Sequence, residues 1–142
     1  MAKELISLGV RRRAGGSTEP VSVTPDITIK QADHPQLIID AKYKTRFSDS
    51  EATTLRIDPA DLYESLAFLE ATSIQRAILL YPMPSGLHEV DSTPGQTLEF
   101  DRITVGTRQI HGVAVHVSGI SNPGGFRRFS ESLSGALRGM IR

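Results

Sequence analysis

Hydrophobic and polar residues alternate in two short segments of the N-terminal half of the chain, residues 24–29 and 37–44. An alternation with a period of two predicts β-strands, whose successive side chains point to opposite faces. The stretch between them, residues 31–36, is rich in residues that favour turns. We therefore predict a β-hairpin with its turn centred near Asp33.

The position of the turn sets the register of this hairpin. Asp26 then lies directly opposite Asp40, and Ile27 lies opposite Ile39. The odd-numbered positions form an apolar face: Val21, Val23, Ile27, Ile29, Leu37, Ile39 and Ala41. The even-numbered positions gather polar groups on the other face: Asp26, Thr28, Asp40 and Lys42. Facing like charges destabilise a ladder, so we expect a cation between the two aspartates, and a divalent one is the usual candidate.

Helical spacing of apolar residues marks two further segments. Asp58 followed by Pro59 predicts an N-cap and a first helical position, and the helix is expected to continue to about Thr72. Its expected apolar face contains Leu62, Leu66 and Leu69. A last helix should follow a turn at residues 122–125, with apolar residues at Phe126, Phe129, Leu133, Leu137 and Ile141.

Three more segments have the composition of strands: residues 76–81, 98–105 and 113–120. At the N-terminus, residues 3–10 are expected to be the end of a helix and residues 14–20 a loop. Strands on both sides of a crossover helix indicate the α/β class, with helices packed on a mixed sheet.

Length and composition limit the possible classes of protein. A chain of 142 residues fits one domain, and the absence of cysteine excludes thiol catalysis, cysteine-bound zinc and disulfides. No apolar run is long enough to cross a bilayer. We expect a cytoplasmic protein with no membrane partner.

The formal net charge is zero, so any binding to nucleic acid must be local. Arginines cluster near both ends, at Arg11, Arg12 and Arg13 and again at Arg127, Arg128, Arg138 and Arg142. These side chains are candidate phosphate contacts, as is Lys44. Solvated surfaces are an equally good interpretation of each cluster by itself.

Asp40 and Lys42 are two residues apart on a predicted strand, so their side chains project to one side about 7 Å apart. Together with Asp26 they offer two carboxylates for Mg²⁺ and an ammonium group beside it. Hydrolysis of a phosphodiester requires a metal that activates water and a cation that orients it or neutralises developing charge. The simpler alternative is the solvent face of an ordinary amphipathic strand.

The chain resembles the PD-(D/E)XK nuclease superfamily, in which Pro25-Asp26 matches the PD element and Asp40-Ala41-Lys42 the second acid and the lysine. Within it, the chain is most similar to the nuclease domain of McrC-type proteins of modification-dependent restriction systems. Three stretches carry that closer likeness: residues 39–44, 61–68 and 79–82. The resemblance covers about residues 23–82.

This resemblance implies a restriction-endonuclease-like, four-stranded mixed sheet flanked by helices, and Mg²⁺-dependent cleavage of DNA, with Mn²⁺ as a substitute. Asp26 and Asp40 would be catalytic metal ligands, and Lys42 would orient the attacking water. Glu64 stands where the family often has glutamine, with Phe68 one helical turn later. Whether Glu64 adds a ligand or is simply solvated stays open.

Relatives usually supply another acid from a helix before the PD strand, and Glu4 is the candidate here. The region through which McrC proteins engage their GTP-hydrolysing motor has no counterpart in the sequence. Residues 1–142 are therefore interpreted as one nuclease-like domain that is truncated, degenerate or separately encoded.

The sequence thus predicts a metal-dependent DNA endonuclease of a restriction or phage-defence system, acting as a homodimer or with other subunits of a complex. The main alternative is a catalytically inactive module that keeps the fold and binds nucleic acid or a partner protein. A second alternative is an assembly subunit whose last helix, with Phe126, Phe129 and Leu133, packs against a partner.

Overall fold

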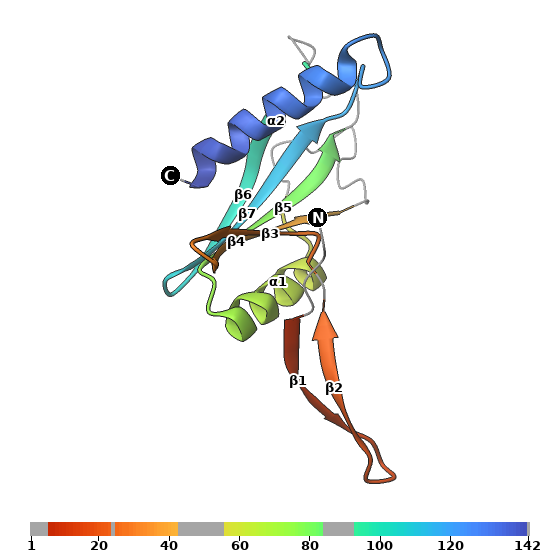
Figure 1. Cartoon of the computed structure of the whole chain (residues 1–142), viewed down its shortest axis with the longest axis vertical. Helices are drawn as coiled ribbons and strands as arrows, with labels where there is room; N and C mark the ends of the chain where they lie inside the picture. Colours follow the sequence, from red (N-terminus) through yellow and green to blue (C-terminus); the bar gives the residue numbers. More distant parts are fainter. Residues whose placement is uncertain (1–5, 24, 43–55, 84–92, 142) are drawn as a thin grey trace. The chain divides into compact units, whose positions relative to one another are not determined.

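The structure is a computed structural model, and it describes residues 6–23, 25–42, 56–83 and 93–141. Figure 1 shows the elements in chain order: β1 (Ile6–Arg12), β2 (Thr18–Val23), β3 (Ile27–Gln31), β4 (His34–Ala41), α1 (Pro59–Thr72), β5 (Arg76–Met83), β6 (Thr97–Val105), β7 (Arg108–His116) and α2 (Gly125–Ile141). The predicted α/β class is confirmed. Glu4, Lys44 and Arg142 lie outside the described residues.

The strands form two sheets. β1 and β2 make a two-stranded sheet, and the other strands make a mixed five-stranded sheet in the order β3-β4-β5-β7-β6. The resemblance implied four strands, whereas both strands of the tight β6–β7 hairpin join the sheet. The turn of that hairpin is made by Gly106 and Thr107, and Gly106 has a φ of 62°, a backbone conformation that glycine adopts without strain.

The chain divides into two compact units. The first contains Met1–Asp40, Ile57–Ile78 and Ile103–Ile110. It thus includes β1 to β3, most of β4, α1, the start of β5, the end of β6 and the start of β7. The second contains Ala41–Arg56, Leu79–Arg102 and His111–Arg142, and thus α2 and the remaining parts of β5, β6 and β7.

The predicted hairpin of β3 and β4 is confirmed, including its register. Ile27 pairs with Ile39 and Ile29 pairs with Leu37 in an antiparallel ladder. The turn residues Ala32 and Asp33 have φ values of 49° and 64°, the left-handed pair that a two-residue hairpin turn requires. The bulge between Ile29 and Lys30 fits this turn to the ladder.

The second half of β4 is buried on both of its faces, whereas residues 34–36 are exposed. Leu37, Ile38 and Ile39 are each at most 2% exposed, and Asp40 is 8% exposed. The face predicted to gather polar groups also contains the buried Ile38, and Asp40 on that face is covered as well. Both faces of a strand are covered where other elements pack on the two sides of its sheet, which an alternation with a period of two does not reveal.

The N-terminal helix predicted over residues 3–10 is wrong for the described part of that segment. β1 and β2 form an antiparallel hairpin in which Arg11 pairs with Glu19 and Val10 with Pro20. Its turn contains Gly15 and Gly16, which stand where a loop was expected. Val21 therefore belongs to β2, and it pairs with β1 instead of extending β3.

α1 begins as predicted. The Asp58 side chain accepts a hydrogen bond from the Ala60 N–H at 3.3 Å, and Pro59 opens the helix. The buried face differs from the predicted leucine stripe, because Leu62 and Leu66 are only half-buried. The buried residues are Asp61, Ser65, Phe68 and Leu69.

α2 is confirmed as the last helix, although β7 ends at His116, four residues before the predicted end of its strand. A Cβ atom on Gly95 would lie 2.3 Å from the carbonyl oxygen of Phe129, so the turn before β6 meets α2 at backbone distance. Phe126, at the start of the helix, is 69% exposed. Among the described residues, no helix is long and apolar enough to span a membrane.

The turn of the β3–β4 hairpin gives a direct test of the register. Ala32 is exposed and has a positive φ, so replacing it changes little except backbone strain. We expect Ala32→Asn to raise the free energy of unfolding by about 0.5 kcal/mol and Ala32→Val to lower it by about 1 kcal/mol. Urea denaturation measures both. Equal stability of the two variants would contradict the left-handed turn.

Candidate functional site

Two aspartates stand at one end of the β3–β4 ladder. Asp26 immediately precedes Ile27, and Asp40 immediately follows Ile39. Ile27 and Ile39 are directly paired in this ladder. Both residues belong to the first compact unit. Asp26 is half-buried and follows the buried Pro25, while Asp40 is 8% exposed. The ladder thus brings two carboxylate-bearing residues to neighbouring positions that are partly shielded from solvent.

The burial of Asp40 weighs against the solvent-face alternative. A carboxylate on an amphipathic surface strand keeps its hydration, whereas this one is covered together with its neighbours Ile38 and Ile39. Burial of a charged group is costly unless a partner or a cation compensates it. Asp40 is therefore placed where an ordinary surface aspartate would not be.

Lys42 follows Asp40 after one residue and belongs to the second compact unit. Its N–H donates a 2.7 Å hydrogen bond to the carbonyl of Leu80 on β5, which fixes its backbone beyond the end of β4. Two peptide units can separate the Cα atoms of Asp40 and Lys42 by at most about 7 Å. The acid and the lysine are therefore close along the chain by covalent geometry alone.

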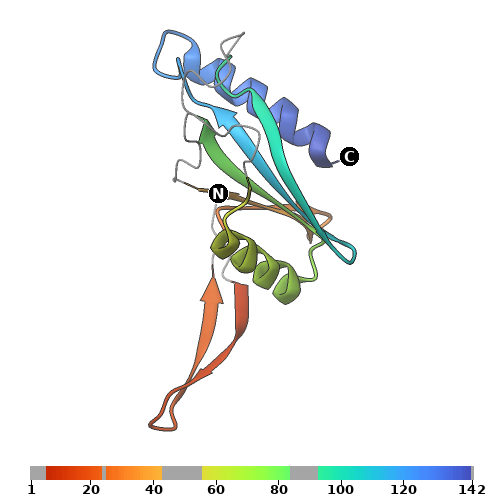
Figure 2. The ribbon, with the colours of Figure 1, turned by 180° about the vertical axis from the view of Figure 1, so that it is seen from behind.

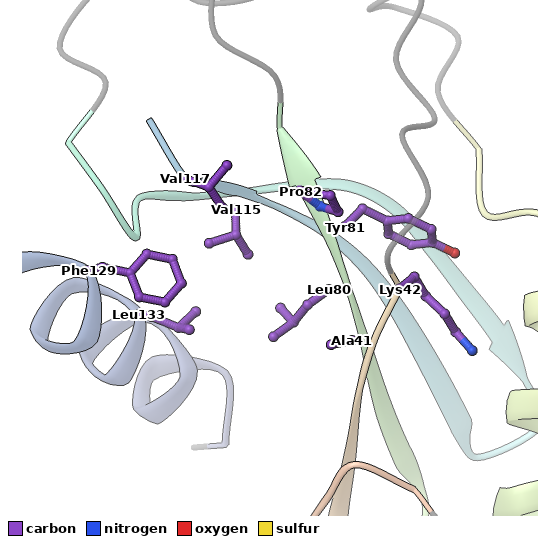
Figure 3. Close-up of a pocket in the computed structure, with 9 residues that line it drawn as sticks. All are labelled: Ala41, Lys42, Leu80, Tyr81, Pro82, Val115, Val117, Phe129 and Leu133. Carbon is purple, nitrogen blue, oxygen red and sulfur yellow. The ribbon is translucent and has the colours of Figure 1, made fainter. Parts of the chain in front are cut away.

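Within the second unit, a cavity of about 310 Å³ lies between α2 and the sheet strands. Figure 3 shows Phe129 and Leu133 of α2 facing Leu80 across it, whereas the Lys42 and Tyr81 side chains extend to the other side of β5. An almost wholly apolar lining does not suit a phosphate. The ammonium group of Lys42 is thus directed away from this cavity.

The donor set for a metal is small. Among the residues that the structure describes, no group of three or more histidines and acids could hold a metal ion together. Magnesium is often bound through one or two carboxylates and keeps several waters, so Asp26 and Asp40 fit it as a minimal pair. Glu4, the predicted additional acid, lies outside the described residues.

α1 contributes acids with two different surroundings. Glu64, the predicted site residue, is exposed, while Phe68 one turn later is buried in the core. The two are neighbours one turn apart on the helix, but only Glu64 reaches solvent. Asp61 is the buried acid of this helix, at 3% exposure, and the sequence did not single it out. Acids in the first turn of a helix are favoured by the helix dipole, and this explains an acid at that position without a functional role.

The predicted phosphate contacts lie on the surface. Arg11 and Arg13 are each 60% exposed and both approach Glu19, with the Arg13 pair at 2.7 Å. On α2, the exposed Arg127 pairs with Glu131 at 3.0 Å, and the exposed Arg128 donates to the Pro123 carbonyl. Arg12 is also exposed, so these arginines are accessible, and they belong to different compact units.

A charged network that the sequence did not reveal joins β6 and β7. Arg102 donates to Glu99 through Nε at 2.7 Å and Nη2 at 2.8 Å, and the buried His111 Nδ1 lies 2.8 Å from the same carboxylate. The hydrogen bond from Arg102, supported by that of His111, lowers the pKa of Glu99 to about 2 against the opposing effect of burial. Spacing alone could not reveal this network, because His111 and Glu99 are twelve residues apart.

Comparison with known proteins adds a family. A model of the family described as McrBC 5-methylcytosine restriction system component matches residues 7–82, more than half of the chain. The matched part includes Asp26, Asp40, Lys42 and Glu64. No curated protein matches the chain.

One similar solved structure is the refined half-complex from a tetradecameric assembly of Thermococcus gammatolerans McrB AAA+ hexamers with bound McrC. The similarity covers 94% of this chain and 28% of that chain, at 14% sequence identity and a TM-score of 0.45. The present chain thus spans little more than a quarter of the length of that relative.

The Glu99 network predicts a pH dependence. Because folding lowers the pKa of Glu99 from 4.5 to about 2, its contribution is complete above about pH 4.5 and is lost as the pH falls toward 2. We expect wild type to melt at a higher temperature than Glu99→Gln at pH 7, and the difference to shrink between pH 4.5 and 3. Thermal unfolding at several pH values measures this. A difference that stays constant with pH would contradict the assigned pairing.

Proposed function

We propose, from the premise that this chain belongs to the family of McrBC 5-methylcytosine restriction system components, that it is a Mg²⁺-dependent endonuclease domain. Its substrate would be DNA, whose phosphodiester bonds it would hydrolyse within a restriction system. The residues that carry this chemistry all lie in the part of the chain that the family matches. We further propose that the domain is of the PD-(D/E)XK type.

The observation that carries the proposal is the pair Asp26 and Asp40 at the end of the β3–β4 ladder, with Asp40 buried. Two carboxylates at facing positions repel each other, and burial strengthens that repulsion because the effective dielectric constant falls. A bound divalent cation removes the repulsion and makes the arrangement favourable. The family's role in restriction supports hydrolysis of DNA as the reaction that such a cation would serve.

Each residue has a chemical task in this proposal. Asp26 and Asp40 would hold Mg²⁺ through their carboxylate oxygens. When bound, the ion supplies Lewis acidity toward a phosphoryl oxygen and toward water. Lys42 carries a positive charge at neutral pH and would orient the attacking water or neutralise negative charge that develops on the phosphate. Glu64, being exposed, is available to solvent or substrate.

A second candidate function has its own supporting observation. Among the described residues no cluster of three acids or histidines could hold a metal, and Glu4, the candidate for the additional acid that relatives usually supply, lies outside them. A catalytically inactive domain that binds nucleic acid or a partner subunit would need no third acid. The family description names one component of a system, so other subunits of a restriction complex are the natural partners under either proposal.

The central test of catalysis is Lys42→Met, measured as nicking or linearisation of supercoiled plasmid in the presence of Mg²⁺ or Mn²⁺, with a chelator as blank. We expect the rate to fall at least about 100-fold, because charge stabilisation in the transition state is lost. The melting temperature should stay near that of wild type. Lys30→Met, at an exposed position on β3, is the matched control and should cleave normally.

Two outcomes decide between the candidates. Full activity of Lys42→Met would refute the role assigned to this lysine. No metal-dependent cleavage by the wild-type chain, with DNA binding retained, would favour the catalytically inactive domain.

A further inference from the structure

The hairpin of β1 and β2, called here the basic ribbon, contains no part of the buried core among its described side chains. Residues 9–18 are all exposed, and the two strands form a sheet of their own. In Figures 1 and 2 the turn that joins β1 to β2 is at the end of the ribbon remote from α1. A hairpin segment with no buried side chain is marginal in water, so core packing does not explain residues 9–18 of the ribbon.

The ribbon has two chemically different faces, set by its register. On one face, Arg11 lies across from Glu19, and Arg13 also donates to that carboxylate at 2.7 Å. This Arg–Glu cluster ties the two strands together and is partly neutralised. The ion pairs of this cluster therefore support the shape of the ribbon.

The other face is composed of two cross-strand pairs, Val10 with Pro20 and Arg12 with Thr18. Val10 is 73% exposed, and Pro20 across from it is exposed as well, so the two form a small apolar surface. Arg12 is exposed, and among the described residues it has no ion pair or hydrogen bond through its side chain. This face therefore offers an uncompensated guanidinium group beside an apolar patch.

We propose that the basic ribbon lies in the major groove of duplex DNA with its Val10 and Arg12 face toward the bases. This inference rests on the proposed function, which supplies DNA as the substrate. Charge complementarity selects a polyanion, because the ribbon carries three arginines and one glutamate in a chain whose formal net charge is zero.

The dimensions of the ribbon agree with this occupant. Two paired strands are about 5 Å apart, and with their side chains they fit a major groove about 12 Å wide. Arginine makes its commonest specific base contact with guanine there, and an apolar side chain can contact the methyl group of thymine. Arg12 and Val10 supply one group of each kind on a single face.

The test measures binding of the full chain to a fluorescently labelled duplex of mixed sequence, in EDTA so that no cleavage occurs. Arg12→Ala should weaken binding several-fold and lower the salt dependence, the slope of log K against log salt, by about one. Arg12→Lys should restore the slope without restoring full affinity. Arg56→Ala, which removes an exposed arginine that precedes α1 and has no assigned role, is the matched control and should bind as wild type does.

A minor-groove ligand such as netropsin separates the two grooves. On an A·T-rich duplex saturated with netropsin, wild-type affinity should be unchanged. Displacement of the protein by netropsin would overturn the assignment to the major groove.

Plasmid cleavage with Mg²⁺ is measured in parallel, so that the two proposals fail separately. If cleavage occurs but Arg12→Ala binds as wild type does, the ribbon proposal is wrong and the nuclease stands. If binding depends on Arg12 but no cleavage occurs, the nuclease is wrong and the ribbon stands. If the wild-type chain does not bind duplex DNA at all, the ribbon proposal is overturned.

Discussion

The pairing of β3 with β4 is the constraint on which the rest of this structure depends. It sets Ile27 against Ile39, and it thereby sets Asp26 beside Asp40 at the end of the ladder. A slip of one residue would move every side chain of one strand to the opposite face. The left-handed turn at Ala32 and Asp33 and the burial of β4 both oppose such a slip.

This constraint links stability to function. Leu37, Ile38 and Ile39 bury almost all of their surface, and burial of each such side chain contributes about 1.5–3 kcal/mol. That favourable term offsets the cost of placing Asp40 in the same covered strand. Acids held on a rigid strand keep a fixed spacing, which a metal site requires.

The basic ribbon contrasts with this rigid strand pair. Its cross-strand ion pairs lie at exposed positions, where such pairs are weak and sensitive to salt. The same arginines that support the strands are accessible to a polyanion. A pair of acids on one hairpin and exposed positive charge on another are the features that the proposed action on DNA requires.

The elements with strong local signals were predictable from the sequence. The turn residues fixed the register of Ile27 with Ile39, and Asp58 and Pro59 marked the start of α1 correctly. Residues 3–10 were misassigned because a short apolar run fits either a strand or a helix, and only pairing with β2 decides between them. The exposure of each face depends on which neighbours cover it, and a period of two does not contain that information.

The candidate site was predictable only in part. The sequence named Asp26, Asp40 and Lys42, and the ladder places the two aspartates at neighbouring positions. It did not reveal that Asp61 is buried, nor that Glu99 bridges Arg102 and His111. Such contacts join residues on different strands or on a helix whose rotation is set by tertiary packing, so local patterns do not determine them.

Binding of Mn²⁺, measured by isothermal titration calorimetry, tests the central claim that Asp26 and Asp40 jointly hold a divalent cation. The claim predicts a saturable site in wild type that is lost in both Asp26→Asn and Asp40→Asn. The site should persist in Asp33→Asn, which changes an exposed acid in the turn of the same hairpin. Equal binding by wild type and Asp40→Asn, or the absence of any site in wild type, would contradict the claim.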